Sequence, residues 1–555
     1  MPNILSKLFC FRRSGSKKTV EVEPPTPLPP LSKTRTSSIA HSPIPEKHTS
    51  ITETPGNRAA SSQCRTLILD LGDVLFHYSA RNLTALSPST FHAVILTPAW
   101  NEYECGRLTE DQVLDAVGKE LSLEPDTIRE ALLQCRETLH VDHELYAQLK
   151  ALKAEMNGNL KVYAMTNISG VDFGRLKAIL PSWDLFDAEF TSFEAGMIKP
   201  ELGYYRHVLD NIDLTEPSSA IFVDDKVANV NAARSFGIHG IVFKSAAELM
   251  RQLRNQLYDP VSRARQYMKE NARNHVSQVE GGPEFRDVFS QFLIHKVLQD
   301  ESIISLSPAN ASAAEIEEVI GKARREAKTW NYFIGSPVGT TKEFPEDVDD
   351  TATALLAFSP PASSANPVLD RFLANRHNRD GLVQTYFDEK RPRVCPVVLT
   401  NVVRVFYHYN RGADIQNEFQ HIRNVLLNRA YVDGTAMYIS AEPFLFFFSC
   451  LVAENPGAVE LQSLREPLAS ALRMRVGRRG DAFAVAARVL ACQSLGVWAD
   501  SDVDYLKELQ ESDGGWEVGW VCRYGRTQKR IGSRGVITAY AIKALEQNGG
   551  TAVEY

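Results

Sequence analysis

The chain has 555 residues, of which 44% are hydrophobic and 23% charged, and its formal net charge is −7. This length predicts two or three domains. The acidic balance argues against nucleic acid as the main partner, because phosphate binding requires a basic face. No run of about 20 apolar residues is present, so no membrane-spanning helix is expected.

The N-terminal segment, residues 1–62, is rich in Pro, Ser, Thr and Lys. Such a composition buries too little apolar surface to offset the entropy of ordering, so we predict a disordered tail. Arg12 and Arg13 interrupt its short apolar stretch, which argues against a signal peptide. The eight cysteines are scattered and form no close pair, as is common in a reducing compartment. We therefore expect a cytoplasmic protein.

Four buried apolar runs follow within residues 63–255, and helical patterns separate them. The runs lie at residues 66–70, 160–167, 220–225 and 238–243. Strands alternating with helices predict a doubly wound parallel α/β sheet. Ligands of such sheets bind beyond the carboxyl ends of the strands. Asp70, Thr166, Asp224 and Asp225 stand at those ends.

Four short motifs in this region suit phosphoryl transfer. They are, in chain order, Asp70-Leu71-Gly72-Asp73-Val74, Thr166-Asn167, Gly196-Met197-Ile198-Lys199-Pro200 and Asp224-Asp225. Asp70 can attack phosphorus, Thr166 can bind a phosphoryl oxygen, and Lys199 can neutralise the transferring group. Magnesium prefers oxygen ligands. The expected magnesium ligands are Asp70, Asp224, Asp225 and Gly72.

These motifs resemble those of the haloacid dehalogenase superfamily. The resemblance implies a Rossmann-like α/β fold whose helical cap lies between Asp70 and Thr166. Phosphatases of that superfamily usually carry a second Asp two positions after the nucleophile, where this chain has Gly72 and then Asp73. An active phosphatase and a retained but inert fold therefore both stay open.

Residues 260–555 carry no convincing series of strands and are expected to form an all-helical domain. Gly and Pro separate its amphipathic segments. The predicted helices lie at residues 283–299, 313–330, 351–358, 397–409, 415–428, 483–495 and 538–546.

The run Glu346–Leu355 places three carboxylates directly before an apolar helix, at Asp347, Asp349 and Asp350. An acidic helix N-terminus favoured by the helix dipole is one explanation. The other is acid catalysis, because crowded, partly buried carboxylates cannot all ionise and one can keep a proton to donate. Aromatic side chains that can stabilise a cation lie in the same region. They are Trp330, Tyr332, Phe333, Tyr386, Phe387, Phe444 and Trp516.

The acidic run resembles the Asp-x-Asp-Asp-Thr-Ala motif of class II terpene cyclases, whose middle Asp is the general acid. That residue corresponds to Asp349, with Asp347 and Asp350 beside it. The segment Gln510–Trp516 resembles the Gln-Trp repeat that braces helices in the same family. The resemblance implies a single α-barrel domain.

A haloacid-dehalogenase-like region followed by one such domain resembles the drimane-type sesquiterpene cyclases, which are mainly fungal. The resemblance implies farnesyl diphosphate as the substrate. Asp349 would protonate its terminal double bond, and two ring closures with proton loss would give drimenyl or albicanyl diphosphate. An active N-terminal domain would then release the alcohol.

Cations for the diphosphate are expected in a basic cluster near the C-terminus. The candidate substrate-binding residues are Arg523, Arg526, Lys529, Arg530 and Arg534, together with Trp516. The segment Lys390–Arg393 is a weaker candidate. A solvated basic loop explains the cluster equally well.

These motifs leave three functions open. The first is a cyclase that also dephosphorylates its product. The second is a cyclase with an inert N-terminal domain, which releases the diphosphate. The third is a magnesium-dependent phosphatase with a helical binding module. The terminal base and the oligomeric state are open.

Overall fold

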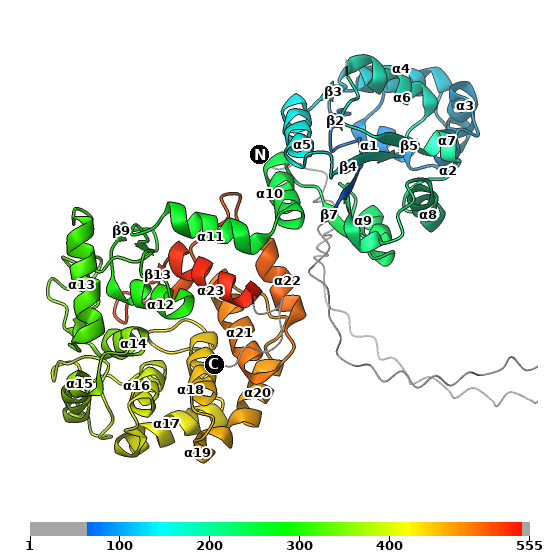
Figure 1. The fold of residues 1–555 in the computed structure, drawn as a ribbon. Helices are drawn as coiled ribbons and strands as arrows, with labels where there is room; N and C mark the ends of the chain where they lie inside the picture. The colour runs from blue at the N-terminus through cyan, green and yellow to red at the C-terminus, as the bar shows by residue number, and fades with distance from the viewer. Residues whose placement is uncertain (1–63, 181, 547–555) are drawn as a thin grey trace, which may run out of the picture. The chain divides into compact units, whose positions relative to one another are not determined.

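A computed structural model of the chain describes residues 64–180 and 182–546 (Figure 1). The predicted tail at residues 1–62 lies outside the described residues. The predicted boundaries between the three segments stay predictions.

The N-terminal part is built on a five-stranded parallel sheet in the order β5-β4-β1-β6-β7. The strands are β1 (Thr66–Leu69), β4 (Lys161–Thr166), β5 (Ala188–Thr191), β6 (Ala220–Asp224) and β7 (His239–Val242). Four of them match the predicted runs. The fifth, β5, was not predicted, because this edge strand is only partly buried and lacks a continuous apolar run.

Side chains of β1 point alternately to the two faces of this sheet, and helices cover both faces. Leu67 and Leu69 belong to one apolar cluster and Ile68 to another. The first cluster includes residues of α5 (His143–Glu155) and α10 (Ala246–Leu257), and the second includes residues of α8 (Leu202–Asn211) and α9 (Val227–Ser235). This double coverage explains why the strands are apolar throughout.

A separate helical cap follows β1, as the sequence predicts. Its helices are α1 (Pro88–Ile95), α2 (Pro98–Glu104), α3 (Glu110–Leu121) and α4 (Pro125–Glu137). They enclose a small core of their own. The short strands β2 (Phe76–His77) and β3 (His140–Val141), which pair with each other, bracket the cap.

The C-terminal part contains a closed ring of helices. Neighbours around the ring pack in the order α12-α14-α16-α18-α21-α23, and α23 packs against α12. The ring helices are α12 (Val288–Leu298), α14 (Val348–Phe358), α16 (Pro396–His408), α18 (Glu442–Glu454), α21 (Ala482–Leu495) and α23 (Arg534–Glu546). This ring is the inner layer of an α-barrel.

Other helices pack outside the ring. They are α11 (Pro260–Glu270), α13 (Ala313–Arg325), α15 (Ala362–Ala374), α17 (Gln416–Leu427), α19 (Val459–Gln462), α20 (Arg465–Arg473) and α22 (Asp500–Glu508). The burial of each layer follows its sequence. Every residue of α14 is buried, whereas α13 buries only the stripe Ile316, Ile320 and Ala323. A helix apolar on all sides belongs inside and one with a single apolar stripe lies outside.

Short strands within this part differ from the sequence expectation. A four-stranded sheet has the order β12-β13-β8-β9, and β10 pairs with β11. The strands are β8 (Ser277–Val279), β9 (Glu284–Phe285), β10 (Trp330–Asn331), β11 (Glu346–Asp347), β12 (Trp520–Arg523) and β13 (Arg530–Gly532). They are too short to show alternation, and β13 pairs with β8 from the far end of the part.

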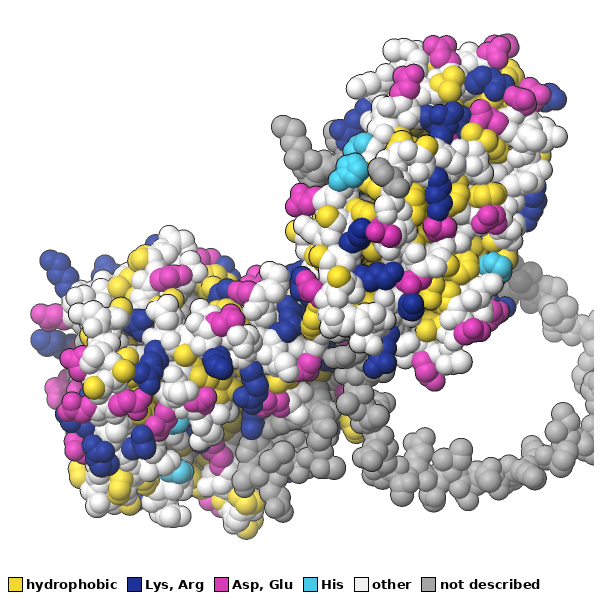
Figure 2. All heavy atoms as spheres, turned by 45° about the horizontal axis from the view of Figure 1, so that its top comes forward, with side chains coloured by type: hydrophobic (Ala, Val, Ile, Leu, Met, Phe, Trp, Pro, Cys, Tyr) yellow, Lys and Arg dark blue, Asp and Glu magenta, His cyan; other side chains and the backbone are white. Residues whose placement is uncertain are grey.

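No helix in the described ranges is both long and apolar enough to span a membrane. On the face drawn in Figure 2, Lys and Arg side chains of the described residues are interspersed with Asp and Glu.

Removing the buried Arg488 is expected to destabilise the barrel. Its guanidinium contacts Asp502 at 2.8 Å and Glu442 at 3.0 Å, and all three side chains are buried. Arg488→Ala leaves two buried carboxylates without this partner, so we expect a loss of about 3–5 kcal/mol in the free energy of unfolding. Urea denaturation measures it. Arg473→Ala, which breaks an exposed pair with Glu466, is the matched control and should cost less than about 1 kcal/mol. Equal losses in the two variants would contradict the argument.

Candidate active sites

The first site lies where three strands of the parallel sheet end. Asp70 follows β1 directly, Thr166 ends β4 and Asp224 ends β6. Because the carboxyl ends of parallel strands meet at one edge, these side chains converge. Carboxylate oxygens of Asp70, Asp224 and Asp225 lie within 4.8 Å of one another. This is the arrangement of the predicted site.

Lys199 joins two of these acids. Its ammonium lies 2.9 Å from Asp70 and 2.7 Å from Asp224, and it also donates to the carbonyl of Met165 at 2.9 Å. Asn167 fixes the Lys199 backbone through two hydrogen bonds of 2.8 and 2.9 Å. Lys199 is therefore held between the nucleophile candidate and the metal-ligand candidates.

Burial raises the pKa of two of the acids at this site. Burial raises the pKa of Asp70 to about 7, although the Lys199 ammonium opposes the rise. Burial also raises the pKa of Asp225 to about 6. Three crowded carboxylates are the donor set that a hard divalent cation takes, so these residues fit Mg²⁺.

Gly72 contributes no side chain to this group. A Cβ at Gly72 would meet no other atom within 4 Å. The next residue, Asp73, has a left-handed backbone with φ of 56°, and burial raises the pKa of its carboxyl group. The structure leaves the metal-ligand role of Gly72 a prediction.

The second site lies at the start of α14. Asp347 is the N-cap residue, and its carboxylate accepts the N–H of Asp349 at 2.7 Å and that of Asp350 at 3.4 Å. Asp349 and Asp350 stand in the first helical turn. All three are buried, with exposed fractions of 7%, 6% and 2%. The run thus forms the acidic helix N-terminus that was the simpler explanation, but the burial of all three carboxyl groups goes beyond what a helix cap requires.

Two side chains from other elements bind the Asp349 carboxyl group. The Tyr438 hydroxyl donates to one oxygen, and the Asn401 amide donates to the other at 2.8 Å. The Arg404 guanidinium donates to the side-chain oxygen of Asn401 at 3.0 Å and to the carboxylate of Glu454 at 2.8 Å. Asp349 thus ends a chain of polar side chains that links the three neighbouring ring helices α18, α16 and α14.

Burial raises the pKa of all three carboxyl groups. Burial raises the pKa of Asp349, although the hydrogen bonds from Tyr438 and Asn401 oppose the rise. Burial and the charge of Asp349 raise the pKa of Asp347 to about 8. Burial and the charges of Asp347 and Asp349 hold the pKa of Asp350 well above its ordinary value. A proton is therefore retained in this cluster at neutral pH.

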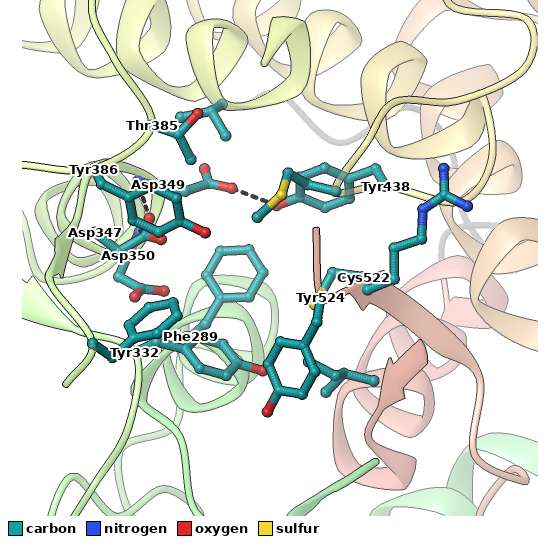
Figure 3. Close-up of a pocket in the computed structure, with 15 residues that line it drawn as sticks. Phe289, Tyr332, Asp347, Asp349, Asp350, Thr385, Tyr386, Tyr438, Cys522 and Tyr524 are labelled. Atoms are coloured by element: carbon teal, nitrogen blue, oxygen red, sulfur yellow. Dashed lines mark hydrogen bonds between the residues drawn. The ribbon is translucent and has the colours of Figure 1, made fainter. Parts of the chain in front are cut away.

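Asp349 faces a pocket of about 60 Å³, which we call the acid pocket. Aromatic rings make up much of its wall. They belong to Phe289, Tyr332, Phe344, Tyr386, Tyr438 and Tyr524. Figure 3 shows Asp349 and Tyr438 pointing toward each other, with the rings of Phe289, Tyr332 and Tyr524 nearby. Such a wall suits an apolar chain that becomes a cation.

Only part of the predicted aromatic set lies here. Tyr332 and Tyr386 line the acid pocket, whereas Phe444 lines a second cavity. The lining of neither cavity, as far as the described residues show, includes Trp330, Phe333, Phe387 or Trp516. Trp516 is fully buried and donates its indole N–H to the carbonyl of Leu506 at 2.8 Å, as a helix-bracing residue would.

The basic cluster is dispersed around the hairpin formed by β12 and β13. Arg523 lines the acid pocket and donates to the carbonyls of Thr435 and Ala436. Arg530 pairs with Glu280. Arg534 pairs with Asp513 at 2.8 Å. Arg526 and Lys529 are exposed on the turn.

The partners of the acid were not predicted from the sequence. Asn401, Arg404 and Tyr438 lie far from Asp349 in the chain, and no motif marks them. One signal was present: an Asn and an Arg in the apolar run of α16 imply buried polar side chains with partners.

Comparison with known proteins relates nearly the whole chain to one relative. Over 482 residues the chain is 39% identical to the drimenol cyclase drtB of Aspergillus calidoustus, and the match covers 87% of this chain and 88% of the relative. The chain belongs to the drimenol cyclase family. Residues 261–409, which include the acidic run, match the family model of the sesquiterpene cyclase astC-like C-terminal domain. The acid therefore lies in the matched part, whereas Tyr438 and Tyr524 complete its pocket from outside that part.

The N-terminal part of the chain has further relatives of its own. It is 34% identical to the sesquiterpene phosphatase astK of Aspergillus oryzae over 190 residues, which are 34% of this chain and 95% of the relative. A magnesium complex of a HAD family enzyme from Bacteroides thetaiotaomicron is 21% identical, covering 33% of this chain and 94% of that one with a TM-score of 0.27. The predicted fold class is confirmed: a haloacid-dehalogenase-like α/β region with a helical cap precedes an all-α barrel.

Proposed function

We propose that the chain is a sesquiterpene synthase that cyclises farnesyl diphosphate to a bicyclic drimane-type diphosphate and hydrolyses this product to the alcohol. One observation carries the proposal. Asp349 is a buried carboxyl group with a raised pKa that faces a small pocket lined by aromatic rings. The relative named drimenol cyclase supports this choice of substrate and skeleton.

In the cyclase site, Asp349 donates its proton to the terminal double bond of the substrate. The new carboxylate keeps its hydrogen bonds from Tyr438 and Asn401 and lies in the first turn of α14, where the helix dipole favours negative charge. The carbocation closes two rings between aromatic walls, and loss of one proton gives drimenyl or albicanyl diphosphate. The Asp347 side chain accepts the N–H groups of Asp349 and Asp350 and so fixes the first turn of α14.

In the N-terminal site, Asp70 attacks phosphorus while Lys199 neutralises the transferring group and Thr166 binds a phosphoryl oxygen. Mg²⁺ held by Asp70, Asp224 and Asp225 would supply further positive charge there. Water then releases phosphate from Asp70. Two such rounds convert the diphosphate into the alcohol and two phosphates. The relative named sesquiterpene phosphatase supports this activity.

Product analysis tests the whole proposal. The purified protein is incubated with farnesyl diphosphate and Mg²⁺, and products are identified by mass spectrometry with and without added phosphatase. We expect a cyclic alcohol in both samples. A cyclic product seen only after added phosphatase would favour the inert N-terminal domain, and linear farnesol alone would favour a phosphatase with a helical binding module.

We also propose a cytoplasmic location. The described cysteines are free thiols, and Cys64, Cys105, Cys135, Cys395 and Cys492 are buried. Buried free thiols suit a reducing compartment. Fluorescence microscopy of a tagged chain in a fungal cell would show the location.

Tyr438→Phe is expected to slow cyclisation and to change its pH dependence. The lost hydrogen bond favours the carboxylate, so its removal raises the pKa of Asp349 and makes it a weaker acid. We expect kcat to fall about 10- to 100-fold, as for loss of a hydrogen bond to a charged group. The alkaline limb of the kcat/KM profile should move to higher pH.

Tyr505→Phe is the matched control, because its hydroxyl lies on the outer helix α22 and contacts only the carbonyl of Gly480 among the described residues. An alkaline limb that moves to lower pH in Tyr438→Phe would contradict the assigned role.

A further inference from the structure

A second cavity adjoins the acid pocket. It has a volume of about 600 Å³, and we call it the wide cavity. Thr385 and Met437 line both cavities. These two side chains therefore form the partition between them.

The wide cavity opens to solvent, whereas the acids lie deep. Arg393, Ala430 and Ala436 line it and are exposed. Asp347, Asp349 and Asp350 line the acid pocket and are buried. A molecule that reaches the acid from this side passes the wide cavity first.

The charge of the wide cavity is positive. Of the described residues that line it, Arg393 is the charged one, and no carboxylate stands among them. The Arg393 guanidinium makes no hydrogen bond or ion pair with any described residue, whereas Arg523, Arg530 and Arg534 are bound to carbonyls or carboxylates. The Arg393 guanidinium can therefore bind an anion that comes from outside the chain.

Gly525 makes room for this guanidinium. A Cβ at Gly525 would lie 2.8 Å from Nη1 of Arg393 and 3.4 Å from Sδ of Met437. The glycine therefore brings the hairpin backbone against both the cation and the partition. This packing places Arg393 beside the passage to the acid pocket.

We propose that the two cavities are the two ends of one substrate site. Arg393 binds the diphosphate in the wide cavity, and the isoprenoid chain passes between Thr385 and Met437 to bring its terminal alkene to Asp349. Met437 suits the partition because an unbranched thioether adapts its shape to a passing chain. This inference rests on the proposed cyclisation and adds where each end of the substrate binds.

Arg393→Ala tests the charged end. We expect KM for farnesyl diphosphate to rise about 10- to 100-fold, as for loss of charge-assisted hydrogen bonds, with kcat little changed. Total cyclic product is measured after added phosphatase, so the result does not depend on the N-terminal site. Arg393→Lys should restore part of the affinity. Lys269→Ala removes an exposed charge on α11, outside the lining of both cavities, and should leave KM unchanged.

Met437→Trp tests the passage. The larger side chain should fill the gap and lower kcat/KM at least about tenfold, whereas Met437→Leu, of similar volume, should keep most activity. Circular dichroism checks that each variant is folded.

Farnesol, which lacks the diphosphate, separates the two roles of the site. Arg393→Ala should not change its rate of cyclisation relative to the wild type. An unchanged KM for farnesyl diphosphate in Arg393→Ala, together with loss of cyclisation in Asp349→Asn, would overturn this inference and leave the proposed function standing. Continued cyclisation by Asp349→Asn would overturn the function itself.

Discussion

Asp349→Asn is expected to lose ring formation, with the rate of cyclic product falling about 10³-fold or more. An amide has no proton acidic enough for an alkene, and neither neighbouring acid has the same two partners. Asp347 is occupied by the N–H groups of its own helix turn, and one oxygen of Asp350 has no hydrogen-bond partner among the described residues. Mass spectrometry after added phosphatase measures the total cyclic product.

Glu346→Gln is the matched control for this experiment. Glu346 stands in the same run, but its carboxylate is partly exposed and pairs with Arg371 at 2.9 Å. We expect nearly wild-type cyclisation from this variant. If Asp349→Asn formed cyclic product at the wild-type rate, the proton would come from another group and the proposed mechanism would be wrong.

Asp70→Asn is expected to stop the reaction at the cyclic diphosphate. Asn is a poor nucleophile toward phosphorus, so release of the alcohol should fall about 10³-fold or more while cyclisation continues. Liquid chromatography with mass spectrometry follows the diphosphate and the alcohol separately. The wild type should accumulate the alcohol and the variant the diphosphate.

Asp184→Asn serves as the control, since Asp184 is exposed and pairs with Lys150 at 2.6 Å. Accumulation of the cyclic diphosphate by both the wild type and Asp70→Asn would show an inert N-terminal domain. That result would leave the cyclase assignment intact.

Local patterns in the sequence predicted the elements that sit at both sites. Four apolar runs became strands of the parallel sheet, because strands covered by helices on both faces are rich in apolar residues. Asp70, Lys199 and Asp224 could be grouped from the sequence, since each stands in a short motif, and the fold brings them together. Asp349 was identified in the same way.

Long-range contacts were not predictable from these patterns. Asn401 and Tyr438 bind Asp349 from other elements, and the pairing of β13 with β8 joins the two ends of the barrel region. The charge of a segment also proved a poor guide to its partners. Arg530 and Arg534 looked available for an anion, but Glu280 and Asp513 neutralise them. Whether a cation is free depends on which acid the fold brings to it.

Asp349 and part of the wall of the acid pocket belong to different elements. Asp349 and its partner Asn401 stand on α14 and α16, whereas Phe289 is on α12 and Tyr524 follows β12. Substitutions at Phe289 or Tyr524 can therefore change the shape of the pocket in which the carbon chain folds without removing Asp349 or Asn401. We expect such substitutions to change the ring skeleton while the acid and its hydrogen bonds stay the same.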